Sequence, residues 1–128
     1  MTDIRVHIIK EEIETYELPP PEDLPYGSQL EFFGVIRPQE DGKTINGIAY
    51  EAYEPMARKV IYTILEELSK EYSLLAAEVV HRVDRVKVGE AAIRVRVWSV
   101  HREEALKACA EFMNRLKQDV PIWKVSTF

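Results

Sequence analysis

"HREEALKACAEFMNRLKQDVPIWKVSTF", residues 101–128, joins a helical pattern to an extended one. Small and apolar side chains recur at steps of three and four residues from Ala105 to Leu116, which predicts a helix with one buried face. Pro121 cannot continue that helix, because it has no backbone N–H and its ring clashes with the preceding turn. We therefore expect a helix, a change of direction and then a short final strand over 121–128.

A second helix is predicted by "EPMARKVIYTILEELSKEY", residues 54–72, in which Pro55 suits the first turn and apolar residues repeat along one face. The C-terminal helix is expected to begin near His101 or Arg102, with Ser99 or His101 as its cap. Alternating or β-branched segments predict strands at 4–9, 28–37, 44–53, 76–83 and 91–100, with a short strand or turn at 84–90. The expected fold class is α+β, with two main helices packed on a largely antiparallel sheet.

The order of these strands also suggests how some of them pair. Between 28–37 and 44–53 lies "PQEDGK", in which Asp41 and Gly42 form a turn signal. We expect these two strands to form an antiparallel hairpin with a loose acidic loop. The strictly alternating segment 91–100 is a candidate pairing or interface strand for a second copy of the chain.

The length of 128 residues fits one domain spanning 1–128, which is large enough for a substantial core without disulfides. The single cysteine favours a reducing compartment. The N-terminus, "MTDIRVHIIKEEIE", lacks the apolar run of a signal peptide, and no segment has the ~20 apolar residues needed to span a membrane. We expect a cytoplasmic protein with no membrane attachment.

The charge distribution is uneven along the chain. The net charge of −5 argues against nucleic-acid binding. Residues 1–75 carry 7 Lys and Arg against 15 Asp and Glu, whereas residues 76–128 carry 10 against 7. Chance and solvated faces are the commoner explanation of such a bias. The alternative is a local anion site in the basic C-terminal part.

Several kinds of catalytic site are disfavoured. Cys109 lies within the apolar stripe of its helix, so we expect it to be a small buried hydrophobe rather than a nucleophile. His7, His81 and His101 are far apart in sequence, with no metal-ligand spacing. The chain has no GxSxG, GxGxxG or P-loop pattern. We therefore expect no metal and no nucleotide.

Basic residues at the ends of elements are the remaining candidates. Lys117 lies about 40° beyond Met113 on the helix, at the edge of the buried stripe, where a lysine ordinarily extends its ammonium to solvent. Lys124 is on the strand face opposite Trp123 and Val125, and we expect Trp123 to anchor that strand in the core.

Three further groups extend this basic set. Arg37 ends a strand, and His101 and Arg102 stand where a strand turns into a helix, whose free N–H groups favour anions. The five cationic or potentially cationic groups have no matching acids nearby in sequence. Such a set suits a phosphate or carboxylate ligand.

These residues carry a resemblance to a known family. "FFGVIR", "YEAYEPMA", "HRVDRVKVGE", "HREEALKACAEFMNRLK" and "PIWK" occur in the order seen in the large, catalytic subunit of molybdopterin synthase, the MoaE family. The resemblance covers about Gly27 to Lys124. The combination of HR, LK and PxWK is specific, whereas any single piece is not.

The resemblance implies an α/β hammerhead fold and a homodimer. Each large subunit is expected to bind one small ubiquitin-like subunit, which gives a heterotetramer. The Gly-Gly tail of the small subunit ends in a thiocarboxylate and enters a pocket on the large one. Sulfur then passes to cyclic pyranopterin monophosphate and builds the dithiolene of molybdopterin, without a metal or nucleotide.

The resemblance also assigns roles to residues. Lys117 and Lys124 match the two active-site lysines of the family. The expected substrate-binding residues are Val35, Ile36, Arg37, His101, Arg102, Val125 and Ser126.

Two departures from the family pattern concern turnover. An acid is usual two residues after the second lysine, where this chain has Ser126, and many relatives continue beyond the position of Phe128 with a polar tail. They motivate an alternative, a catalytically silent dimeric scaffold that binds the small subunit. A third interpretation is a small-ligand regulatory domain of α+β type.

Overall fold

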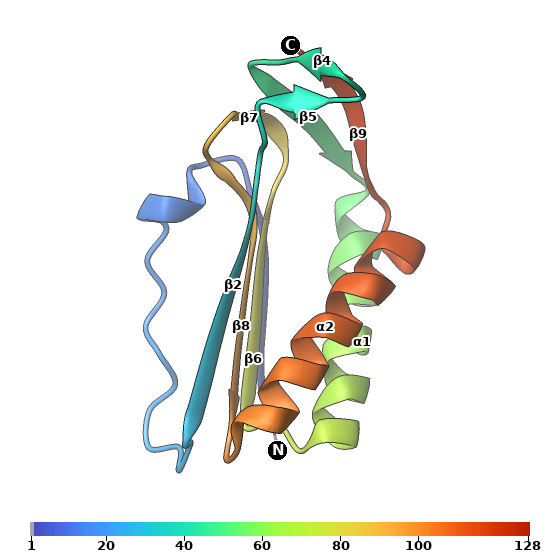
Figure 1. Cartoon of the computed structure of the whole chain (residues 1–128). Helices are drawn as coiled ribbons and strands as arrows, with labels where there is room; N and C mark the ends of the chain where they lie inside the picture. Colours follow the sequence, from blue (N-terminus) through green and yellow to red (C-terminus); the bar gives the residue numbers. More distant parts are fainter. Residues whose placement is uncertain (1) are drawn as a thin grey trace.

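The computed structural model describes residues 2–128 (Figure 1). The helices are α1 (Glu54–Tyr72) and α2 (Arg102–Asp119), with a short 3-10 helix, η1 (Ile13–Thr15). The strands are β1 (Asp3–Ile9), β2 (Ser28–Val35), β3 (Gln39–Glu40), β4 (Lys43–Thr44), β5 (Gly47–Ala52), β6 (Ala76–Arg82), β7 (Asp84–Lys87), β8 (Ala91–Ser99) and β9 (Ile122–Thr127). Within the described residues, neither helix is long and apolar enough to cross a membrane.

The main sheet has four strands in the order β1-β6-β8-β2. β1 runs parallel to β6, and the other two pairs are antiparallel. Figure 1 shows α1 and α2 side by side on one face of this sheet. The predicted α+β fold, with two helices on a largely antiparallel sheet, is confirmed.

The main core lies between the helices and this face of the sheet. The apolar stripes of α1 and α2 supply fully buried residues such as Leu65 and Phe112, and the sheet supplies Val79 and Val95. Burying side chains of this size contributes roughly 1.5–3 kcal/mol each. The apolar faces that the periodicity predicted for the two helices are therefore buried, because the sheet covers both of them.

The opposite face of the sheet is also covered. Residues 10–27, the N-terminal segment, lie across it and include η1 (Figure 1). Arg94 donates a hydrogen bond to the backbone oxygen of Tyr16 in this segment at 3.1 Å. Arg94 and Arg96 both approach the Glu78 carboxylate, at 3.2 and 3.0 Å, and all three side chains are buried. Both faces of β8 are therefore inside the protein.

Two pairing predictions are wrong. Residues 28–37 and 44–53 do not form a hairpin, because β2 pairs with β8 whereas β5 pairs with β7 and β9 in a separate sheet. β8, which covers most of 91–100, has β6 on one side and β2 on the other, so neither of its edges is free to pair with a second copy.

The predicted turn at Asp41 and Gly42 is present, but it joins shorter strands than expected. Asp41 and Gly42 have φ values of 52° and 77°, as a two-residue hairpin turn requires, but they join only the short strands β3 and β4. A bulge between Gly34 and Val35 ends the regular pairing of β2, and Pro38 has no N–H with which to extend a ladder. The flanking segments therefore diverge into different sheets.

The smaller sheet, in the order β7-β5-β9, sits at one end of the molecule beyond the last turn of α2 (Figure 1). Trp123 lies on its edge strand β9 and is 48% exposed, so the prediction that it anchors the strand in the core is wrong. An edge strand at the end of the molecule has too little protein above it to bury a large indole. The packed residues of this sheet are instead aliphatic, with Ile48 and Val86 at the centre.

Candidate functional site

A pocket of about 500 Å³ lies where the smaller sheet meets the end of α2 and the main sheet. Six elements contribute to it: β2, β5, β6, β8, α2 and the start of β9. Its lining residues are Gly34, Val35, Ile36, Tyr50, His81, Ala92, Ile93, Met113, Leu116, Lys117, Ile122, Trp123 and Lys124.

The two predicted lysines meet in this pocket. Lys117 comes from the last turn of α2, next to the half-buried Met113 and Leu116, and Lys124 comes from β9. The turn at Pro121 brings them together, and its carbonyl accepts a hydrogen bond from Tyr53 N–H at 3.1 Å. Both lysines are exposed, so each ammonium is available to a ligand in the pocket.

Lys124 has an acidic partner that sequence proximity did not reveal. Its Nζ donates to both carboxylate oxygens of Glu40 at 3.1 Å, from a residue 84 positions away in the chain. Glu40 is fixed by the tight β3–β4 hairpin. No acid lies near Lys124 in the sequence, as stated, but the loop described as loose brings one to it from a distant part of the chain.

The other expected residues near the pocket differ in position. Val35 and Ile36 line the wall, as expected of the end of β2. Arg37 is exposed and lies beyond that lining. Val125 and Ser126 are exposed on β9, and the bulge opposite Ala49 and Tyr50 shifts Ser126 to pair with Ala49.

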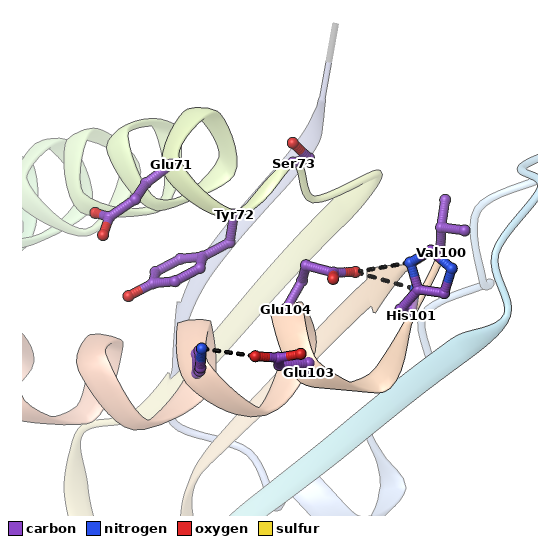
Figure 2. Close-up of a pocket in the computed structure, with 8 residues that line it drawn as sticks. Glu71, Tyr72, Ser73, Val100, His101, Glu103 and Glu104 are labelled. Atoms are coloured by element: carbon purple, nitrogen blue, oxygen red, sulfur yellow. Dashed lines mark hydrogen bonds and ion pairs between the residues drawn. The ribbon is translucent and has the colours of Figure 1, made fainter.

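His101 and Arg102 lie at the opposite end of α2. Fifteen residues separate Arg102 from Lys117, so the two are about 22 Å apart along the helix axis. Figure 2 shows His101 beside a hollow between the end of α1 and the start of α2. Within one chain, the structure brings the two lysines together but does not bring this pair to them.

The surroundings of His101 are also acidic rather than purely basic. Its backbone N–H donates to the Glu104 carboxylate at 3.1 Å, and its ring Nδ1 lies 3.7 Å from the same group. The neighbouring Glu103 pairs with Lys107 at 2.7 Å (Figure 2). The expectation that no acids lie nearby in sequence was wrong for His101 and Arg102, because the first turn of α2 supplies two, Glu103 and Glu104.

Two residues that line the pocket, Tyr50 and His81, were not predicted from the sequence. Their rings pack edge to face with centroids 5.6 Å apart. Burial raises the pKa of Tyr50, although the positive charge of Lys124 opposes that shift. Burial lowers the pKa of His81 below its usual value. Both are polar residues on strands, and their local sequence patterns do not distinguish them from other such residues.

Cys109 lies in the main core and outside the pocket lining. Burial raises the pKa of its thiol, so the reactive thiolate is disfavoured at neutral pH. The prediction that Cys109 is buried as a small hydrophobe is confirmed.

The fold and this site define an α+β protein that offers two lysine ammonium groups to a ligand in a largely apolar pocket. A family model described as "MoaE protein" matches residues 7–119. The chain belongs to the MoaE family. The family predicted from the sequence is confirmed.

Relatives with curated names agree with that assignment. The chain is 37% identical over 98 residues to the molybdopterin synthase catalytic subunit of Thermoplasma volcanium, which covers 77% of this chain and 72% of the relative. It is 36% identical over 104 residues to that of Nostoc sp., covering 80% of this chain and 63% of the relative. The name these relatives share is that of an enzyme subunit.

Solved structures show the same fold. A crystal structure of molybdopterin synthase from Staphylococcus aureus superposes with a TM-score of 0.82 at 31% identity, covering 92% of this chain and 87% of that one. A structure described as a complex of subunits 1 and 2 of molybdopterin-converting factor from Helicobacter pylori has a TM-score of 0.73 at 21% identity, over 93% and 82% of the two chains.

Proposed function

We propose that this protein transfers sulfur from the C-terminal thiocarboxylate of a small ubiquitin-like subunit to cyclic pyranopterin monophosphate. The product is the dithiolene of molybdopterin, within molybdenum cofactor biosynthesis. The observation that carries this proposal is the convergence of Lys117 and Lys124, from α2 and β9, on one pocket of a MoaE-family chain.

The electrostatics of the pocket suit this chemistry. The substrate brings a phosphate and the sulfur donor brings a thiocarboxylate, so two anions must approach each other. Two fixed ammonium groups offset that repulsion and stabilise negative charge that develops at the attacked carbon. The apolar walls, such as Ile93 and Met113, strengthen these interactions by keeping the local dielectric low.

The proposed sulfur donor is a partner protein. A flexible Gly-Gly tail is narrow enough for a pocket of about 500 Å³, and its terminal anion is complementary to the lysines. The description of the Helicobacter pylori structure as a complex of two subunits supports the existence of such a partner in this family.

The proposal includes a homodimer. His101 and Arg102 lie about 22 Å along α2 from Lys117, too far to contact the same small substrate within one chain. We therefore assign the phosphate-binding roles of His101 and Arg102 to the pocket of a second copy. Arg37, exposed next to the pocket wall, is the candidate phosphate ligand from the same copy as the lysines.

The silent-scaffold alternative rested on the acid absent at Ser126 and on the short C-terminal tail, and the structure bears on the first of these. In this chain Glu40 supplies a carboxylate to Lys124 from the β3–β4 hairpin. Lys124 therefore has an acidic neighbour, although that residue comes from a different part of the chain. This favours a catalytically active protein over the silent scaffold.

The test is reconstitution of the reaction. The full chain is incubated with cyclic pyranopterin monophosphate and a thiocarboxylated small subunit, and molybdopterin formation is measured. We expect product with the thiocarboxylated subunit and none when its tail is an ordinary carboxylate. Stable binding of the small subunit without any product would contradict the proposal and favour the scaffold.

A further inference from the structure

His81 is the polar end of an otherwise apolar row on β6. Ala77, Val79 and His81 alternate onto the same face, and the first two are in the main core beneath the helices. His81 pairs with Ile93 on β8, and both residues line the pocket. At this point the face of the sheet borders the pocket instead of the helices. Its side chain is only 6% exposed. Burying a polar ring here costs free energy that a valine at this position would not cost.

The hydrogen bonding of His81 fixes which nitrogen is free. Nδ1 lies 2.7 Å from the backbone oxygen of Arg82. A carbonyl oxygen can only accept, so Nδ1 carries the hydrogen and donates it. In a neutral imidazole the other nitrogen, Nε2, is then a lone-pair acceptor. No side chain or backbone group among residues 2–128 hydrogen-bonds to Nε2 in the structure.

The pocket needs a group that can accept a proton, and Nε2 of His81 is able to do so. The Tyr50 ring of β5 packs against the ring of His81, and Lys117 of α2 and Lys124 of β9 line the same pocket. Lys124 is paired with the Glu40 carboxylate. A protonated lysine has donors only and accepts no proton. Burial lowers the pKa of His81 and outweighs the opposing effect of its hydrogen bond to the Arg82 carbonyl, so the neutral imidazole, which is the form able to act as a base, is favoured.

We propose that His81 is the proton acceptor of this pocket, taking a proton at Nε2 from the water that attacks the acyl carbon of the sulfur carrier. This inference rests on the proposed sulfur transfer. When the carrier's thiocarboxylate delivers its sulfur, the acyl carbon needs an oxygen to become a carboxylate, and water supplies it.

The step acts on the thioester that exists once the carrier's sulfur has bonded to the substrate. An electron pair of the water oxygen forms a bond to the acyl carbon of this thioester, and the bond between the acyl carbon and sulfur breaks with its electron pair left as a thiolate on the substrate. One water proton passes to Nε2, which gives an imidazolium whose Nδ1–H still bonds the Arg82 carbonyl. The second proton leaves when the new carboxylic acid ionises in solvent, and the imidazolium returns its proton to sulfur or to water.

The test is single-turnover sulfur transfer by the full chain over a range of pH. His81→Asn keeps an N–H donor near the Arg82 carbonyl but removes the base. We expect its rate to fall about 10²- to 10⁴-fold. Because burial lowers the pKa of His81 from its usual value, the wild-type rate should fall as the pH drops through that lowered pKa. His81→Asn should lose this acidic limb.

A rescue experiment separates chemistry from folding. His81→Ala opens space in the pocket, and added imidazole should restore part of its rate, more so as the pH rises through the pKa of the added base. His7→Asn is the matched control, since His7 also packs edge to face on a tyrosine, Tyr16, but lies outside the pocket. We expect His7→Asn to keep the wild-type rate and pH profile.

The outcomes are distinguishable. A folded His81→Asn with the wild-type rate and acidic limb overturns the role of His81 while the proposed function stands. Absence of rescue in a His81→Ala variant that melts cooperatively and binds the small subunit also overturns it. Absence of transfer by the wild type overturns the proposed function and this inference together.

Discussion

Lys117 and Lys124 present the same group to the pocket by different means. Lys117 extends from the last turn of α2, and Lys124 is held by both oxygens of Glu40. Both lysines are exposed, so neither contributes a large buried area to the fold. At the residue scale, function and stability should therefore separate cleanly.

Lys117→Ala and Lys124→Ala should each leave the free energy of unfolding almost unchanged, within about 0.5 kcal/mol. Each should lower sulfur transfer by about 2.7–4 kcal/mol of transition-state stabilisation, since a preorganised charge at the reacting centre is lost. Lys→Arg should rescue poorly, because a guanidinium is wider and does not release its proton. Molybdopterin formation and melting curves would be measured in parallel.

Lys107→Ala is the matched control for these variants. Lys107 is exposed on the same helix and pairs with Glu103, outside the pocket. It should keep wild-type turnover. If the Lys117 and Lys124 variants also keep it, both lysines are ordinary surface residues.

Glu40→Gln should separate binding from catalysis. The substitution removes the charge that holds Lys124 in place, so we expect kcat to fall. KM for the anionic substrate should not rise, because a negative charge has left the neighbourhood of the pocket. Steady-state kinetics measure both constants. Asp41→Asn on the same turn, which pairs with no cation among the described residues, should change neither; an equal change in both variants would reflect hairpin disruption alone.

At the element scale, β8 carries the least expected feature of the fold. Its arginines look solvent-facing in an alternating pattern, yet Arg94 and Arg96 are buried against Glu78 beneath the N-terminal segment. When a buried carboxylate is shared by two guanidinium groups, removal of one partner costs folding free energy, because it leaves a buried charge uncompensated. The cluster therefore ties β6 and β8 to the N-terminal segment.

Glu78→Gln should destabilise the fold by about 3–5 kcal/mol, because the buried Arg94 loses its counter-charge and Arg96 keeps only Glu31, at 3.5 Å. Urea unfolding followed by circular dichroism measures this. Glu54→Gln is the control, since its pair with Arg58 is exposed and of the i,i+4 type, worth about 0.3–0.5 kcal/mol. Equal midpoints for the two variants would show that the buried cluster adds no stability.

The elements also show what a sequence can and cannot predict. The pattern in 54–72 matches α1 at both ends, because helix hydrogen bonds and apolar periodicity are local. Strand partners are non-local, so a correct turn at Asp41 and Gly42 led to a wrong hairpin. The lysines were found through a motif within one short stretch.

Tyr50, His81 and Glu40 were missed for a related reason. Each lies far in sequence from Lys124, and only the meeting of three sheets and a helix brings them to it. Nothing in their local patterns distinguishes them from other polar residues on strands. The family motif identified the two lysines of the pocket, and the tertiary structure revealed the polar residues around them.

At the scale of the whole molecule, α2 separates two sets of expected substrate ligands. Lys117 and Lys124 lie at one end, and His101 and Arg102 at the other, about 22 Å away along the axis. A symmetric dimer that sets the start of one α2 beside the end of the other would join the sets twice, once per pocket. The homodimer, the single domain over 1–128 and the cytoplasmic location stay predictions.

Mixing two inactive variants tests this arrangement. Lys117→Ala has an intact Arg102, and Arg102→Ala has an intact Lys117. If each pocket takes its lysines from one chain and its arginine from the other, a mixed dimer contains one fully intact pocket. Random reassociation makes half of the dimers mixed, so co-refolded variants should recover about a quarter of wild-type activity. If Arg102 acts within its own chain, or not at all on this substrate, the mixture gains nothing over the average of its parts. Light scattering of the same samples measures the dimer directly, and a 14.8 kDa species at micromolar concentration would contradict the shared pocket before any assay is run.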